Sequence, residues 1–249
     1  MLECDRDTEF KMIAKRYEQN FHHLFLIAGS KSEAHDYFVA RIEEKLANEP
    51  PHRAVRLTWT RGLRPASAAV FRERIARAPE VNCRDAELVP RLRQLIRDRN
   101  LILIFPLIDG EYDDESLIAC FRQWIPDLIR EIQPVRRFKC IQPVAWDDAK
   151  GLPAAALRWF GRTPDEESAA LALMTKLESA TPDITAARVK LTRITDQHVI
   201  DFCEVFGLGQ YERDALFKRI RDRKAETTEL ILRIIDKFME ERRAQRRVS

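Results

Sequence analysis

The sequence is 249 residues long, with 45% hydrophobic residues, 33% charged residues and a formal net charge of +3. This composition suits one large domain, or a domain with a smaller appendage, and indicates many amphipathic helices with solvated outer faces. No apolar run approaches the length of a membrane span and the polar N-terminus MLECDRDTEF is not a secretory signal, so no membrane association is expected and a cytoplasmic protein is predicted.

The five cysteines predict neither a disulfide framework nor a metal site. They are odd in number, widely scattered and never in the C-x-x-C spacing that is typical of zinc ligands. Cys120, Cys140 and Cys203 lie among apolar residues, as expected of buried thiols in a reducing compartment. No residue is therefore expected to bind a metal.

The first part of the chain alternates helices with short apolar strands. After a first amphipathic helix through about Asn20, strands are predicted at 24–28, 54–59, 101–105 and 138–143, and helices at 33–47, 66–78, 85–99 and 115–132. The continuous apolar run LILIF at 101–105 is typical of a strand covered on both faces. This alternation predicts a three-layer α/β fold around a parallel sheet with right-handed crossovers.

The pattern changes near Trp146. Proline and glycine interrupt the chain at Pro153, Gly161, Pro164 and Pro182, which indicates short helices. After Thr195 the sequence is helical, with three helices predicted and the first ending at Gly207 or Gly209. We therefore predict an α/β domain at residues 1–150 and a helical C-terminal region at residues 151–249.

The first predicted strand runs through Gly29 into a helix, and a P-loop of a nucleotide hydrolase lies at such a junction. Its pattern is G-x-x-x-x-G-K-[ST], with backbone N–H groups around the phosphate, a lysine on the outer phosphates and a hydroxyl on Mg²⁺. Placed on Gly29, the pattern puts Ala34 at the second glycine, His35 at the lysine and Asp36 at the Ser/Thr. Asp36 would repel phosphate, and Ala34 resists the left-handed backbone that glycine permits. The phosphate loop is therefore predicted to be degenerate, with no nucleotide or other cofactor bound.

Three stretches of the chain carry a resemblance to a known family. They are HHLFLIAGSKSEAHDYFVARI, then LILIFPLIDGEYDDESLIACFRQWIPDLI, then FKCIQPVAW followed by a helical tail that contains ITDQHVIDFCEVFGL. Together they resemble the inactive STAND domains, which are degenerate relatives of the STAND class of P-loop NTPases in prokaryotic conflict and defence systems. The resemblance implies a P-loop NTPase type of sheet with a helical C-terminal region.

The same resemblance implies a Walker B acid that the sequence lacks. An active member would end the strand at 101–105 in an acidic residue that holds Mg²⁺ through water, whereas this strand ends in Phe105 and Pro106. The nearest acid is Asp109, which we interpret as part of a solvated acidic loop that caps the next helix.

Lys31 and Ser32 superficially resemble the Lys-Ser of a P-loop, but they follow Gly29 too closely to wrap a phosphate chain. We interpret them as a strand-to-helix turn with Ser32 as the N-cap. A shortened anion-binding loop at the helix N-terminus stays open as an alternative, with Lys31, Ser32 and Asp109 as substitute phosphate and metal groups.

As a function, the resemblance implies a non-catalytic adaptor or scaffold in a bacterial defence or signalling complex. STAND proteins couple a nucleotide-driven switch to sensing and to an effector, and inactive versions keep the module as a bridge. The expected partner is a protein, such as an effector or sensor encoded nearby, and no residue is predicted to be catalytic. Two alternatives remain: a divergent ATP-binding STAND switch, and an accessory subunit of an RNA-guided (CRISPR-type) defence complex.

Nucleic acid is only weakly indicated as a partner. Arginines recur between Arg61 and Arg99 and in the tail from Arg242 to Arg247, but acids offset them over the whole chain. Such spacing usually marks a solvated helix face.

Overall fold

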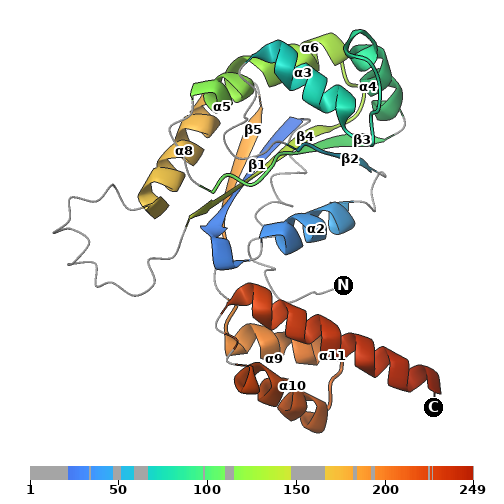
Figure 1. The fold of residues 1–249 in the computed structure, drawn as a ribbon, viewed down its shortest axis with the longest axis vertical. Helices are drawn as coiled ribbons and strands as arrows, with labels where there is room; N and C mark the ends of the chain where they lie inside the picture. The colour runs from blue at the N-terminus through green and yellow to red at the C-terminus, as the bar shows by residue number, and fades with distance from the viewer. Residues whose placement is uncertain are drawn as a thin grey trace, which may run out of the picture.

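The computed structural model describes residues 22–33, 35–46, 52–58, 67–97, 99–109, 115–146, 166–181, 184–191, 194–223, 225 and 227–248. Within these ranges the chain forms a three-layer α/β fold, with one sheet between two helical layers, followed by a group of three helices (Figure 1). The helix predicted before Asn20 and the residue Ala34 lie outside the described residues.

The sheet has five parallel strands in the order β2-β3-β4-β1-β5. They are β1 (His22–Ser30), β2 (His52–Arg56), β3 (Asn100–Ile104), β4 (Phe138–Trp146) and β5 (Thr185–Lys190). Strand β1 lies between β4 and β5, with Gly29 beside Ala145 and Ala28 beside Lys190. The predicted three-layer α/β fold around a parallel sheet, with a helical C-terminal region, is confirmed.

Helices cover both faces of the sheet (Figure 1). On one face lie α3 (Ala68–Arg77), η2 (Asp85–Glu87), α4 (Leu88–Ile96), α5 (Glu115–Ala119), the π-helical turn η3 (Cys120–Trp124), α6 (Ile125–Ile132) and α8 (Glu166–Ala180). The opposite face carries α2 (His35–Leu46), which packs Phe38, Val39 and Ile42 on the sheet. Successive side chains of each strand point to opposite faces of the sheet, so each strand contributes residues to both cores.

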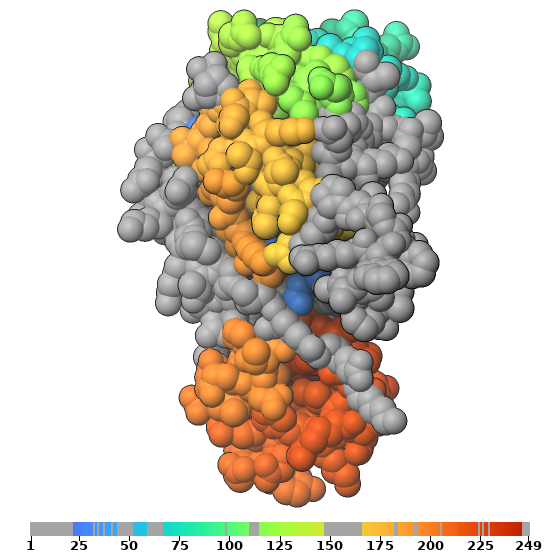
Figure 2. All heavy atoms as spheres, turned by 90° about the vertical axis from the view of Figure 1, so that its left-hand side faces the viewer, coloured from blue at the N-terminus to red at the C-terminus, as the bar shows by residue number. Residues whose placement is uncertain are grey.

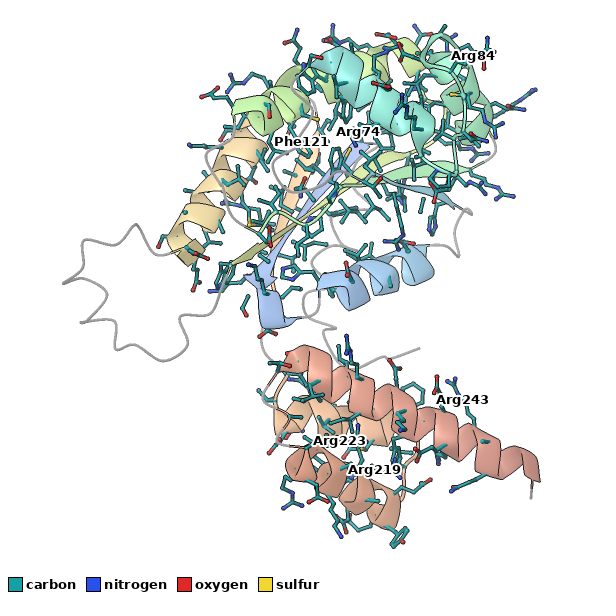
Figure 3. All side chains as sticks on the ribbon, viewed as in Figure 1. Arg74, Arg84, Phe121, Arg219, Arg223 and Arg243 are labelled. Carbon is teal, nitrogen blue, oxygen red and sulfur yellow. The ribbon has the colours of Figure 1, made fainter. Side chains whose placement is uncertain are left out.

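Aromatic rings fill the larger of these cores. Phe121 lies between the helical layer and the sheet (Figure 3), and its ring centroid is 4.9 Å from that of Phe105. Cys120 and Cys140 are buried in the same core, and burial raises the pKa of both thiols. The prediction that the thiols are buried is confirmed for these two and for Cys203, which is buried among the C-terminal helices.

Strand β5 was not among the predicted strands. Its sequence TAARVK is short, contains two alanines and exposes Arg188 and Lys190, so its apolar signal is weak. It nevertheless pairs with β1 at the edge of the sheet. The range 151–249, predicted as helical, thus contributes α8 and β5 to the α/β layers, and the described part that is purely helical begins at α9.

The last three helices form a separate lobe (Figure 2). They are α9 (Asp196–Val205), α10 (Gln210–Asp222) and α11 (Thr228–Val248), with their own apolar core. Gly207 ends α9 with a φ of 58°, as predicted for a glycine C-cap. Arg242 donates hydrogen bonds to the carbonyls of Phe206 and Gly207, at 3.2 and 3.3 Å, so α11 holds the end of α9. None of the described helices combines the length and apolar character needed to cross a bilayer.

Candidate functional site at the degenerate phosphate loop

The candidate site is the turn that joins β1 to α2 at the carboxyl edge of the sheet. Strand β1 ends at Ser30, a 3-10 turn η1 spans Lys31–Glu33, and α2 begins at His35. The α-helix was predicted to begin at Glu33, so the 3-10 turn delays its start. Ligands of open parallel sheets bind at this edge, which makes the turn the first place to test for chemistry.

Gly29 is packed closely by side chains. A Cβ placed on Gly29 would lie 3.0 Å from Cβ of Leu191, 3.3 Å from Cβ of Glu33 and 3.4 Å from Cε1 of His35. In a P-loop the glycines let the backbone approach phosphate. At Gly29 the neighbours include Glu33, a carboxylate residue, and Leu191, which follows β5.

This packing predicts whether replacing Gly29 raises or lowers the free energy of unfolding. An alanine inside a strand is ordinarily the more stable choice, yet Gly29→Ala is expected to lower the free energy of unfolding by about 1–2 kcal/mol, because its methyl group would crowd Leu191. Urea denaturation measures the change. Gly209→Ala is the matched control, because a Cβ there meets nothing within 4 Å, and it should show a smaller loss. Equal losses in the two variants would contradict the packing.

His35 occupies the position of the P-loop lysine. It is buried, and its Nε2 lies 3.0 Å from the backbone carbonyl oxygen of Val144 on β4. A carbonyl only accepts, so Nε2 carries the proton of this hydrogen bond. His35 therefore ties the first turn of α2 to the neighbouring strand. Asp36, at the Ser/Thr position, is exposed.

Lys31 and Asp109 are brought together although the sequence separates them widely. Strand β3 ends before Phe105, and the chain then rejoins β4 through a bridge between Ile108 and Val144. That bridge carries Asp109 to the loop, where its Oδ2 lies 3.5 Å from Nζ of Lys31. Both side chains are about one-third exposed, at 33% and 35%. The two proposed substitute groups thus form an ion pair, and the side chain of Ser32 lies outside the described atoms.

Glu33 links the loop to the helical lobe. It is buried, and its Oε2 accepts a hydrogen bond of 2.9 Å from Oγ1 of Thr228, the first residue of α11. The same hydroxyl accepts a 3.1 Å hydrogen bond from the backbone N–H of Ile194, just before α9. A carboxylate at a helix N-terminus is also favoured by the helix dipole. We call this set of contacts the Glu33–Thr228 latch.

Sequence reasoning missed both residues of the latch. Glu33 was predicted only as the first residue of a helix, and Thr228 was one polar residue in a helical tail. The available signal was weak: Glu33 follows a buried strand, and a threonine begins an apolar helix. Among the described residues, no group of three His, Cys, Asp or Glu side chains could hold a metal ion.

No protein-family model and no curated protein matches the sequence. Among solved structures, the Aeropyrum pernix ORC2 protein in ADPNP–ADP complexes is similar, with 12% identity and a TM-score of 0.43 over 95% of this chain and 68% of that chain. A chain of Drosophila ORC bound to poly(dA/dT) DNA and Cdc6 has 13% identity and a TM-score of 0.40, over 80% of this chain and 30% of that chain. Identities and TM-scores this low assign neither a family nor a function.

Proposed function

We propose that the protein is a non-catalytic scaffold that keeps the architecture of a P-loop nucleotide hydrolase and works through protein–protein contact. The observation that carries this proposal is the Glu33–Thr228 latch, with its 2.9 Å hydrogen bond buried inside the loop. In a nucleotide switch, a phosphate couples the loop to the rest of the protein. Here the side chains of the protein couple the loop to the helical lobe directly.

Charge at the loop supports the same proposal. A P-loop binds phosphate through converging backbone N–H donors and a lysine. Glu33 and Asp36 are acidic residues, and the one lysine of the turn, Lys31, already pairs with Asp109. A phosphate charge about 4 Å from the Glu33 carboxylate would be repelled by about 4 kcal/mol per unit charge at an effective dielectric constant near 20. These charges support the proposal that the loop binds no triphosphate.

Calorimetry with Mg-ATP tests the proposal. The expected result is no binding tighter than a Kd of about 1 mM, together with no ATP turnover. Lys31→Ala should change neither reading, and Lys218→Ala, an exposed lysine of α10, is the matched control. Micromolar binding that is lost in Lys31→Ala but kept in Lys218→Ala would overturn the proposal.

A divergent ATP-binding switch is the second candidate, favoured by one specific observation. Lys31 and Asp109 lie 3.5 Å apart at the carboxyl edge of the sheet, where a substitute phosphate group and a substitute metal group would be needed. For that function the pair would have to separate and Glu33 would have to leave its buried place, so we rank this candidate second.

The proposed setting follows the resemblance to inactive STAND domains. It is a cytoplasmic bacterial defence or signalling complex in which the scaffold bridges a sensor and an effector. An accessory role in an RNA-guided complex is a compatible alternative, but the charges do not favour nucleic acid. Figure 3 shows Arg74 and Arg84 on the α/β layers and Arg219, Arg223 and Arg243 on the helical lobe, so these arginines do not form one stripe. Arg219 is also paired with Glu241 at 2.6 Å.

A further inference from the structure

A second surface lies at the opposite edge of the sheet from the phosphate loop, where the parallel strands begin. Helix α6 ends there at Gln133, which adopts the left-handed conformation with a φ of 49°. The chain then turns through Pro134, Val135 and Arg136 into β4. Val135 is 69% exposed, and it is one of only three large hydrophobic side chains recorded as exposed in the described part of the protein.

Arginines from a second chain segment flank this turn. Arg93 of α4 donates hydrogen bonds to the carbonyl oxygens of Glu131 and Ile132, at 2.6 and 3.1 Å, which places α4 against the end of α6. Arg97 follows one helical turn later and is exposed. The backbone N–H of Leu101 bonds the carbonyl of Arg137 at 3.0 Å.

The strand register brings Arg99 to the same end of the sheet. Leu101 pairs with Phe138, and the backbone N–H of Arg137 donates to Oδ1 of Asn100 at 3.2 Å, so Arg99 and Arg136 lie on adjacent segments that lead into β3 and β4. Both of these arginines are exposed. We define the Val135 surface as Val135 with Arg97, Arg99 and Arg136.

The two carboxylates of α6, the helix that leads to the Val135 surface, are paired with other arginines. Glu131 accepts a 2.7 Å hydrogen bond from Nη1 of Arg72, and Asp127 pairs with Arg130 at 2.6 Å. Asp98 stands between two of the arginines in the sequence and lies outside the described residues. Among the described residues, the surface therefore presents one aliphatic side chain together with three exposed arginines.

We propose that the Val135 surface docks an acidic segment of a partner protein in which carboxylates flank one apolar side chain. The inference rests on the proposed scaffold function and names the chemistry of the partner. Protein interfaces combine apolar contact with arginine, and a water-excluding apolar centre strengthens the charge pairs around it. Charge complementarity fixes the sign of the partner and speeds its association.

A protein partner fits this surface better than a nucleic acid. Single strands bind through aromatic side chains on which bases stack, combined with a basic groove. Val135 offers no aromatic plane for stacking. Among the large hydrophobic side chains exposed in the described residues, Tyr211 alone is aromatic, and it belongs to α10 in the other lobe.

Fluorescence anisotropy with a defined probe tests the proposal. The probe is a glutamate- and aspartate-rich peptide with a central leucine; a peptide of equal charge with a central serine and an oligo-dT of equal charge are the comparisons. We expect the leucine peptide to bind the full-length protein at low salt, several-fold more tightly than the serine peptide and the oligo-dT. Val135→Ser should abolish the difference between the peptides, and the double variant Arg99→Glu/Arg136→Glu should weaken binding by about tenfold or more.

The control is the double variant Arg221→Glu/Arg223→Glu, which makes the same charge change on exposed arginines at the end of α10 and should bind like the parent. Circular dichroism confirms that each variant is folded. Three results would overturn the proposal: no binding of either peptide, equal weakening in the two double variants, or oligo-dT binding as tight as that of the leucine peptide. The Mg-ATP calorimetry tests the phosphate loop at the opposite edge of the sheet and should give the same result in these variants, so a failure of the docking surface is separable from a failure of the scaffold proposal.

Discussion

Replacing Lys139 with methionine is expected to stabilise the protein by about 2–4 kcal/mol at pH 7, because the substitution removes a buried ammonium group. Lys139 is fully buried on β4, beside His23 of β1 and Ile102 of β3. Burial lowers the pKa of Lys139 from 10.5 to about 7, and the nearby Arg137 adds to the effect. Methionine has a similar length and no charge to desolvate.

The gain should depend on pH in a defined direction. In the parent protein, the unfolded chain binds more protons than the folded one between about pH 7 and pH 10.5, so its stability rises with pH across this window. The destabilising effect of Lys139 is therefore complete below about pH 7 and is lost as the pH approaches 10.5. The advantage of Lys139→Met should shrink accordingly.

Urea denaturation at about pH 6, 7, 8.5 and 10 measures how the stability gain of Lys139→Met depends on pH. Lys218→Met, at an exposed position on α10, is the matched control and should differ little from the parent at every pH. A stability difference for Lys139→Met that stays constant across the series would contradict the lowered pKa of Lys139.

Thr228→Val is expected to lower the free energy of unfolding by about 2–3 kcal/mol, since it leaves two buried polar groups without the hydroxyl that joins them. The hydroxyl donates to Glu33 at 2.9 Å and accepts from the N–H of Ile194 at 3.1 Å. Valine keeps the shape of threonine, so the loss reports on hydrogen bonding. Hydrogen exchange should also become faster at Ile194 and in the first turn of α11.

A double-mutant cycle isolates the latch. If Thr228 acts through Glu33, the double variant Thr228→Val/Glu33→Ala should lose less stability than the sum of the two single variants, because alanine removes the acceptor of the hydrogen bond. Thr175→Val, which alters an exposed hydroxyl on α8, is the matched control and should lose less than about 1 kcal/mol. Strict additivity of the Thr228 and Glu33 changes would argue against a direct contact.

Sequence patterns predicted the elements with strong apolar signals. The runs LFLIA and LILIF are buried on both sides, as in a covered parallel sheet, and they became β1 and β3. The long amphipathic stretch from Glu115 to Ile132 became α5, η3 and α6 in one continuous helical run. Strand β5 escaped prediction because an edge strand needs little apolar character, so the helical prediction for residues 151–249 was wrong at residues 185–190.

Some features of the candidate site were likewise predictable from the sequence, and others were not. The sequence alone shows that His35 and Asp36 replace the lysine and the Ser/Thr of the P-loop, because the motif depends on spacing within one turn. The Glu33–Thr228 hydrogen bond joins residues 195 positions apart, and no local pattern predicts which helix end will reach the loop. The pairing of Lys31 with Asp109 likewise depends on the bridge between Ile108 and Val144, which returns the chain to β4 after β3 has ended.

The sequence by itself determined that helices alternate with buried strands and that the phosphate-loop motif is incomplete, because hydrophobic periodicity and motif spacing are local properties of the chain. The tertiary structure alone decided that Glu33 is buried against Thr228 and that arginines from two segments surround Val135. These contacts depend on strand order and register, which set distances between residues that the chain keeps far apart.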